Sequence, residues 1–449
     1  MQYNLRSHVA AKAGVLVAEH PELIYDWNKV YEKSQKPAGR VLLDDESLRD
    51  GLQSPSVRDP SIEEKIEILH LMEGLGIDML DVGLPAAGPR PFEHCLALVN
   101  EIAAQKMRIQ PNAAVRTHET DIRALSDIQQ KSGYAVEAAM FIGSSPIRRY
   151  TEDWTDDFLL QATEKSVKLA RSLNIEVMYV TEDTTRCDPE TVKRLYTAAI
   201  ECGARAITLT DTTGHATPMG TLALTKFVIE NVIKPSGRKV RLDWHGHCDR
   251  GLAVANSIAA LVAGADCVHG TATGIGERVG NTQMDLMLVN LKLMGVEPWV
   301  NRDLTGLKAY CDAVSRATDV KIPCNYPVVG SDAFRTATGV HASAVIKAFR
   351  KNDEILANTV YSGVPSHYFG MEQTIDIGPM SGKSNVIFWL ERHGFEPNDE
   401  LVDIIFQKAK RSDRTLGDAE IMDCCTCFAQ QKGCFPTAKS AVNVKTTPQ

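Results

Sequence analysis

Two histidines separated by one glycine, His245 and His247, are the clearest sign of chemistry in the sequence. They follow a short apolar run at residues 240–244 that predicts a β-strand. Side chains two positions apart in a strand point to the same side, so we expect the two imidazoles to lie together at the end of this strand. One carboxylate from elsewhere, Asp50, would complete three ligands for a divalent metal such as Zn²⁺, Mn²⁺ or Fe²⁺. Two histidines that bind no metal are the alternative.

Charged and hydroxyl side chains follow the ends of other apolar runs in the same way. They are Arg49 and Asp50, Glu182 and Asp183, Asp211, Thr212 and Thr213, and Glu277, Arg278 and Asn281. Arg49 beside Asp50 is either a surface ion pair or a cation that stabilises an enolate or alkoxide near a metal. Glu182 could simply neighbour a helix N-cap, and Thr212 could bind a substrate carboxylate or satisfy a loop amide.

The elements that would carry these residues alternate along the chain as strand and helix. Apolar runs at residues 41–43, 79–82, 108–115, 136–142, 176–180, 206–210, 240–244 and 267–270 are each followed by a stretch of helical periodicity. This alternation implies right-handed crossovers and a parallel sheet. Eight such units in about 250 residues fit a closed (β/α)8 TIM barrel, whose loops after the strands form one rim. The polar residues above are therefore expected to meet at that rim.

A doubly wound open sheet is the alternative α/β fold. Its dinucleotide-binding version would carry GxGxxG after the first strand, where this chain reads DDESLRD at residues 44–50. We therefore predict a catalytic TIM barrel at residues 41–300, preceded by a helical segment at residues 1–40. Helical subdomains at residues 301–436 and a flexible tail at residues 437–449 would form a mostly helical C-terminal extension.

Composition and charge exclude several classes of protein. The net charge is −8, which gives no general attraction to nucleic acid. No run of about 18 apolar residues is present to cross a membrane. The N-terminus lacks the pattern of a signal peptide and the eleven cysteines are scattered, so we expect reduced thiols and a cytoplasmic protein. The cluster Cys424, Cys425 and Cys427 is either a metal site or a set of surface thiols on a terminal helix.

Three segments of the predicted rim resemble the motifs of one enzyme family. They are residues 47–55 (SLRDGLQSP), residues 245–257 (HGHCDRG, then AVANS at 253–257) and residues 274–281 (GIGERVGN). In this order they resemble the motifs of metal-dependent TIM barrels that condense or cleave acyl-CoA compounds. The family includes 2-isopropylmalate synthase, homocitrate synthase and 3-hydroxy-3-methylglutaryl-CoA lyase. The resemblance covers roughly residues 41–296 and extends more loosely into the C-terminal part.

The resemblance implies a metal centre and a cation beside it. Asp50, His245 and His247 would hold a divalent metal (Mg²⁺, Mn²⁺ or Zn²⁺), with Asn281 at or near it. Arg49 would bind the substrate and polarise the reacting oxygens.

The same resemblance implies residues for proton transfer and substrate binding. Glu182 and His341 would take part in proton transfer, and which of them is the base stays open. Thr212 would hold the carboxylate of a 2-oxo acid. In this family the C-terminal segment commonly reaches over the barrel of a partner subunit, which implies a homodimer with shared active sites.

The implied activity is that of an acyltransferase that joins acetyl-CoA to a 2-oxo acid, giving a 2-alkylmalate-type product and CoA. A 3-hydroxyacyl-CoA lyase is the alternative, because Leu52 stands where synthases usually carry Glu. The GERVGN segment and the long C-terminal addition favour the synthase. A non-catalytic barrel is a third reading, but Arg49, Asp50, His245 and His247 are all retained.

Overall fold

The computed structural model describes residues 23–28 and 36–431, and the chain divides into two compact units, Met1–Pro323 and Cys324–Gln449. Each unit is described separately below. The division falls after Pro323, later than the boundary expected near residue 300, because α12 (Leu307–Thr318) packs on α2 (Ile62–Leu75) of the first unit. The predicted tail lies outside the described residues, as does most of the predicted N-terminal segment.

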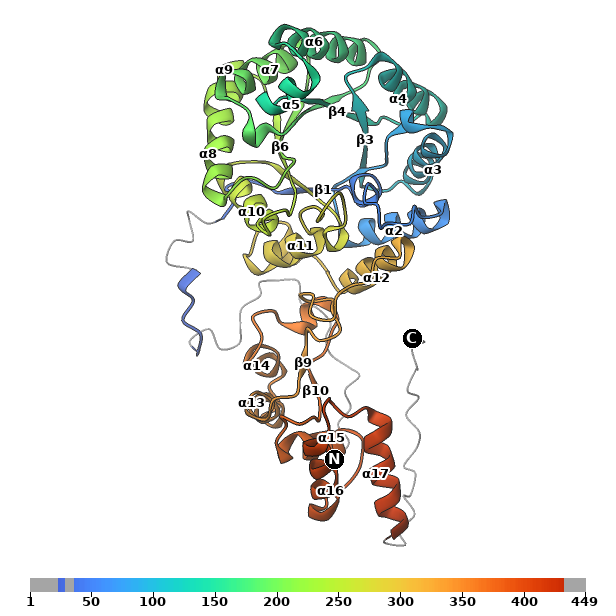
Figure 1. The fold of residues 1–449 in the computed structure, drawn as a ribbon, viewed down its shortest axis with the longest axis vertical. Helices are drawn as coiled ribbons and strands as arrows, with labels where there is room; N and C mark the ends of the chain where they lie inside the picture. Colours follow the sequence, from blue (N-terminus) through green and yellow to red (C-terminus); the bar gives the residue numbers. More distant parts are fainter. Residues whose placement is uncertain (1–22, 29–35, 432–449) are drawn as a thin grey trace. The chain divides into compact units, whose positions relative to one another are not determined.

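The first unit is a closed barrel of eight parallel strands, which confirms the predicted (β/α)8 TIM fold (Figure 1). The strands are β1 (Leu42–Asp45), β2 (Met79–Asp81), β3 (Gln110–Arg116), β4 (Glu137–Gly143), β5 (Val177–Glu182), β6 (Ala206–Asp211), β7 (Arg241–Gly246) and β8 (Cys267–Gly270). Each strand pairs with the next, and β1 pairs with β8 to close the ring, with Asp44 opposite His269. The open-sheet alternative is therefore wrong.

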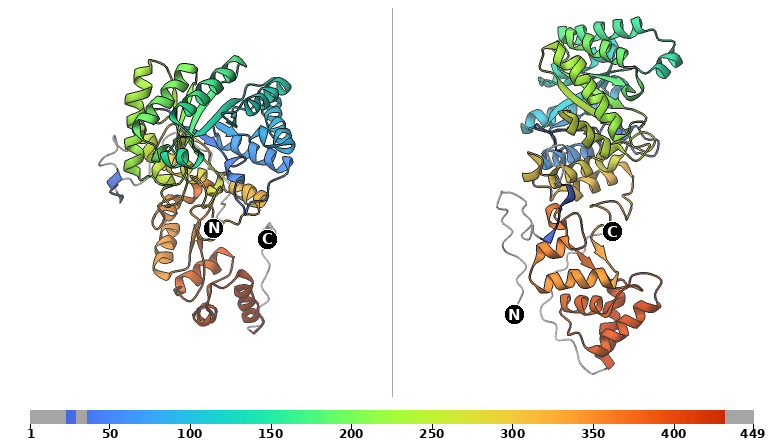
Figure 2. Two further views of the ribbon diagram at one scale, coloured as in Figure 1. Left: turned by 45° about the horizontal axis from the view of Figure 1, so that its top comes forward. Right: turned by 90° about the vertical axis from the view of Figure 1, so that its left-hand side faces the viewer.

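Helices surround the strands on the outside of the barrel (Figures 1 and 2). Besides α2 they are α3 (Pro89–Gln105), α4 (Glu119–Ser132), α5 (Pro146–Glu152), α6 (Asp156–Ser172), α7 (Pro189–Cys202), α8 (Pro218–Val228), α9 (Lys234–Ser236), α10 (Ala253–Ala263) and α11 (Met284–Leu293). Ile229–Ile233 forms a π-turn that joins α8 to α9. No helix of the described residues has the length and apolar character needed to cross a membrane.

Local sequence sets the ends of these helices. In α2 the Ser61 hydroxyl accepts from the backbone N–H of Glu64, while the Glu64 carboxylate accepts from the backbone N–H of Ser61. This capping box satisfies two donors that the first turn cannot satisfy by itself. The helix ends at Gly76, whose φ of +77° suits a residue without a side chain. Apolar faces of the helices then cover the outward faces of the strands.

Charged side chains occupy part of the barrel interior. Asp44 and Asp243 are fully buried there. Asn112 Nδ2 donates to Asp44 Oδ2 at 2.8 Å, and Arg241 Nε donates to Asp243 Oδ1 at 2.9 Å. Alternation along β7 puts His245 on the same side as Asp243, one step nearer the carboxyl end of the strand. Buried polar side chains of the barrel interior therefore lie next to the site at the barrel mouth.

The second unit is mostly helical, as predicted. It contains α13 (Gly339–Arg350), α14 (Glu354–Thr359), α15 (Lys383–Arg392), α16 (Asp399–Arg411), α17 (Asp418–Gln431) and a short parallel pair, β9 (Arg335–Thr336) with β10 (Thr374–Ile375). The cysteine cluster lies on α17, where Cys425 packs in the apolar core of this unit and Cys427 is exposed. Among the described residues, the groups able to hold a cation do not include these cysteines, so the metal reading of the cluster finds no support.

Candidate metal site at the barrel mouth

The structure brings together the three predicted metal ligands. His245 lies near the end of β7 and His247 just beyond it, and they are 9% and 4% exposed. Asp50 begins the short turn η3 (Asp50–Leu52) that follows β1. The two Nε2 atoms are 3.2 Å apart, and Asp50 Oδ2 lies 3.9 Å from His245 Nε2 and 3.6 Å from His247 Nε2. Residues almost 200 positions apart in sequence thus meet at one rim because β1 and β7 both flank β8.

These separations fit a cation bound between the three atoms. A triangle with such edges has a point about 2.1 Å from every corner, which is the usual distance from Zn²⁺ to imidazole nitrogen and carboxylate oxygen. Among the described residues, Asp50 Oδ2 is buried and has no hydrogen-bond donor. A buried carboxylate oxygen without a donor is costly unless a cation satisfies it. The donor set and its spacing therefore fit a divalent metal.

Charge states at the site suit a cation as well. Burial and the neighbouring His245 lower the pKa of His247 to about 4, so this imidazole is neutral at pH 7. Burial opposes ionisation of Asp50, but Arg49 and the two neighbouring histidines together outweigh it, so the pKa of Asp50 lies below its usual value. Metals bind deprotonated ligands, so neither residue has to lose a proton first.

Arg49 is held by three carboxylates at once. Its Nε donates to Asp81 Oδ2 at 2.7 Å, its Nη1 to Asp50 Oδ1 at 2.8 Å, and its Nη2 to Glu46 Oε1 at 3.1 Å. The side chain is only 19% exposed, so the reading as a surface ion pair is wrong. Its charge stands beside the candidate ligand Asp50, where negative charge on a substrate oxygen would be stabilised.

Asn281 lies beside His247 through an antiparallel backbone bridge. Its Nδ2 donates to the carbonyl of Ile275 at 3.2 Å. Its Oδ1 is buried and has no hydrogen-bond partner among the described residues. That oxygen is available to a ligand, which agrees with the expected place of Asn281 at or near the metal.

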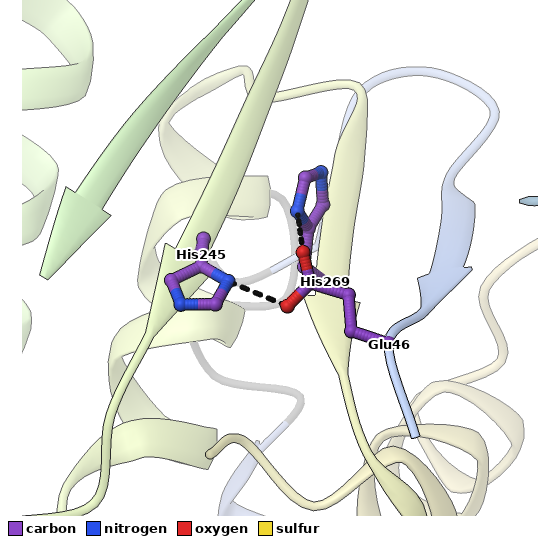
Figure 3. Close-up of side chains that lie close together, drawn as sticks. All are labelled: Glu46, His245 and His269. Carbon is purple, nitrogen blue, oxygen red and sulfur yellow. Dashed lines mark hydrogen bonds and ion pairs between the residues drawn. The ribbon is translucent and has the colours of Figure 1, made fainter. Parts of the chain in front are cut away.

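Glu46 and His269 are neighbours of the site that sequence reasoning missed. Figure 3 shows the Glu46 carboxylate between the rings of His245 and His269. Its Oε2 lies 2.8 Å from His245 Nδ1 and its Oε1 lies 3.0 Å from His269 Nδ1. The Oε1 contact is a hydrogen bond from the ring N–H of His269, whereas Oε2 makes an ion-pair contact with His245. The acidic run at residues 44–46 was the signal available, because strand alternation places Asp44 and Glu46 on one side.

Glu182 and Thr212 lie on neighbouring strands of the same rim. Glu182 ends β5, and burial raises its pKa above the usual value. Thr212 follows β6, and its Oγ1 accepts from the backbone N–H of Asp183 at 2.8 Å, so this hydroxyl does satisfy a loop amide. Both residues line a cavity of about 340 Å³, together with Arg148 and Arg186.

His341 belongs to the second unit. It lies on α13, its side chain is exposed, and its ring stacks on Tyr361 with ring centres 4.2 Å apart. Val340 beside it is 73% exposed. Its catalytic role stays a prediction.

The fold and the site together define a class: an eight-stranded α/β barrel with a candidate divalent-cation site at the carboxyl ends of its strands. The model of the HMGL-like family matches residues 40–311, more than half of the chain. The chain belongs to this family, as its motifs indicated.

Relatives cover most of the chain. The 2-isopropylmalate synthase of Shouchella clausii is 33% identical over 370 residues, which span 82% of this chain and 69% of that protein. The homocitrate synthase AksA of Methanopyrus kandleri is 30% identical over 383 residues, spanning 85% and 89%. The hydroxymethylglutaryl-CoA lyase of Pseudomonas aeruginosa has a TM-score of 0.51 at 20% identity and covers 63% of this chain and 94% of its own. At that identity the likeness to the lyase supports the fold alone.

Proposed function

We propose that this protein is an acyltransferase that condenses acetyl-CoA with a 2-oxo acid, releasing CoA and a 2-alkylmalate-type acid. The observation that carries the proposal is the convergence of Asp50, His245 and His247 beside Arg49 at the barrel mouth. The names of the relatives, 2-isopropylmalate synthase and homocitrate synthase, point to the same reaction type.

Each residue of the rim has a part in the proposed reaction. Asp50, His245 and His247 would hold the metal, with Asn281 beside them. A divalent cation, when bound, polarises a carbonyl group and makes its carbon electrophilic. Arg49 would stabilise the negative charge that develops on the ketone oxygen as the new carbon–carbon bond forms.

Proton transfer and orientation fall to other groups. His341, with Glu182 as its partner, would remove a proton from the methyl group of acetyl-CoA. The raised pKa of the partly buried Glu182 suits a group that takes part in proton transfer. Thr212 would bind the carboxylate of the 2-oxo acid. Hydrolysis of the thioester then releases CoA.

A homodimer with shared active sites is part of this proposal. Exposed apolar side chains occur in loops and helices that follow strands at the barrel mouth: Ile147, Tyr150, Met219 and Val279. The second unit also exposes apolar side chains around His341: Val340, Tyr361 and Met380. Exposed apolar patches mark interaction surfaces. We infer that the second unit of one subunit covers the barrel mouth of its partner and supplies His341.

A lyase acting on a 3-hydroxyacyl-CoA is the second candidate, and Leu52 is the observation that favours it. Incubation of the purified protein and a divalent metal with acetyl-CoA and a panel of 2-oxo acids tests both. We expect free thiol to appear with one or a few of these acids, and mass spectrometry to identify the product. Cleavage of a 3-hydroxyacyl-CoA without thiol release in the panel would favour the lyase. A protein that neither binds divalent metal nor turns over either substrate class would contradict both.

A further inference from the structure

We propose that Glu46 is a positioning residue for the metal ligand His245, and that His269 in turn holds Glu46 in place. The proposal rests on the metal site put forward above. It concerns a residue outside the group of predicted ligands and outside the SLRDGLQSP segment.

The contacts form an ordered series behind the candidate metal site. His245 turns its Nε2 toward Asp50 and His247, and its Nδ1 toward Glu46 Oε2 at 2.8 Å. Glu46 is 4% exposed, and its other oxygen accepts from His269 Nδ1 at 3.0 Å. One carboxylate oxygen thus lies against each ring (Figure 3), and Oε1 also accepts from Arg49 Nη2 at 3.1 Å.

This arrangement favours one tautomer of His245. A carboxylate has no proton to donate, so its approach to 2.8 Å from Nδ1 favours the form of His245 that carries its proton on Nδ1. Its Nε2 then carries the free lone pair that faces the other two ligands. Hydrogen bonding of the second ring nitrogen to a carboxylate fixes the orientation of a metal-binding histidine and raises its basicity.

His247 lacks such support. Its Nδ1 is buried and has no hydrogen-bond partner among the described residues. Of the two imidazoles, only His245 is therefore oriented by a neighbouring carboxylate, so losing Glu46 should weaken the site strongly.

His269 makes ion-pair contacts with two carboxylates of the barrel interior. Its Nε2 lies 3.5 Å from Asp243 Oδ2 and 3.8 Å from Asp44 Oδ2, and the ring is 2% exposed. Asp243 in turn accepts from Arg241. The polar interior of the barrel thus holds Glu46 against His245.

The first test is metal affinity, measured by titrating the metal-free, full-length protein with Zn²⁺. An amide can accept from only one of the two rings, so we expect Glu46→Gln to weaken Zn²⁺ binding about 10- to 100-fold. Asp45→Asn is the matched control, because Asp45 is the adjacent, fully buried carboxylate on β1 and contacts Tyr310 of α12 instead of the site. We expect Asp45→Asn to bind Zn²⁺ within threefold of the wild type.

The visible spectrum of bound Co²⁺ is a second readout, since it reports ligand geometry and not folding. We expect it to change in Glu46→Gln and to stay unchanged in Asp45→Asn. For His269, alanine removes the donor to Glu46, whereas asparagine keeps an N–H near the position of Nδ1. We expect His269→Ala to weaken Zn²⁺ binding several-fold and His269→Asn to recover most of it.

Unchanged Zn²⁺ affinity and Co²⁺ spectrum in Glu46→Gln would overturn the proposal, as would an equal loss of affinity in Asp45→Asn. If the proposed metal site itself does not exist, a different result is expected: the wild type and His247→Ala would bind Zn²⁺ equally weakly. Circular dichroism of each variant verifies that it is folded before the titration.

Discussion

At the scale of single residues, the guanidinium group of Arg49 is held in one orientation beside Asp50. Three carboxylates bind its three guanidinium nitrogens, so the side chain cannot turn away from Asp50. Its planar group matches this fixed set of acceptors, which a lysine could not reproduce. Neutral His247 and ionised Asp50 complete a set of side chains whose charge states already suit a cation.

Variants at two histidines should distinguish metal binding from proton transfer. We expect His247→Ala to abolish both metal binding and turnover, because it removes one of three ligands. His341→Ala should lower turnover about 100-fold or more while leaving metal affinity unchanged. Metal content after dialysis and kcat with the best 2-oxo acid measure the two effects. Equal metal loss in both variants would refute this division.

At the scale of elements, the acidic side chains at the end of β1 make contacts on both faces of the strand. Glu46 and Asp44 face the barrel interior and the site, whereas Asp45 faces α12 and accepts from the Tyr310 hydroxyl. This contact ties α12 to the side of β1 that faces away from the site. The rim is built from strand ends, and the surrounding helices keep those ends in register.

The contact between β1 and α12 predicts a pH effect on stability. Burial raises the pKa of Asp45 to about 6, above the usual value of about 3.9. The folded state then binds this proton more tightly than the unfolded state, so the contribution is present at low pH and is lost as pH rises from about 4 to about 6. The loss amounts to at most about 3 kcal/mol.

Urea unfolding of the metal-free protein at pH 4.5 and pH 7 checks this effect. Because other carboxylates also titrate in this range, the informative quantity is the difference between wild type and Asp45→Asn. We expect the fall in unfolding free energy with rising pH to be smaller in the variant. An identical pH dependence in both proteins would show that Asp45 does not titrate as stated.

The capping box of α2 gives an element-scale prediction of stability alone. Ser61→Ala removes the hydroxyl that accepts from the Glu64 N–H and should lower the unfolding free energy by about 1 kcal/mol. Activity and metal affinity should not change, because α2 lies outside the barrel and contributes no residue to the site. Chemical denaturation and the condensation assay measure the two quantities, and Ser56→Ala in the preceding loop is the control.

At the scale of the whole molecule, the proposed homodimer requires each site to draw on two chains. Mixing His247→Ala with His341→Ala then creates heterodimers in which one site has both residues intact. After subunit exchange of equal amounts, we expect about a quarter of the wild-type activity to return. Sedimentation analysis verifies the dimer. No recovery in exchanged heterodimers would place both residues of a site on one chain.

The sequence by itself determined the barrel and most of the candidate site. Periodicity located all eight strands, because buried parallel strands and their covering helices leave different apolar patterns. Positions after strand ends identified Asp50, His245 and His247, because parallel strands of a closed barrel must end at one rim.

Only the tertiary structure determined which neighbouring side chains contact those residues. The pairing of Glu46 with His245 and His269 joins three strands, and β1 reaches β8 only when the barrel closes. Likewise, the burial of Arg49 among three carboxylates depends on Asp81 from β2. Local patterns report which face of a strand is buried, but they do not report which strand lies beside it, so these contacts follow from ring closure and not from any one segment.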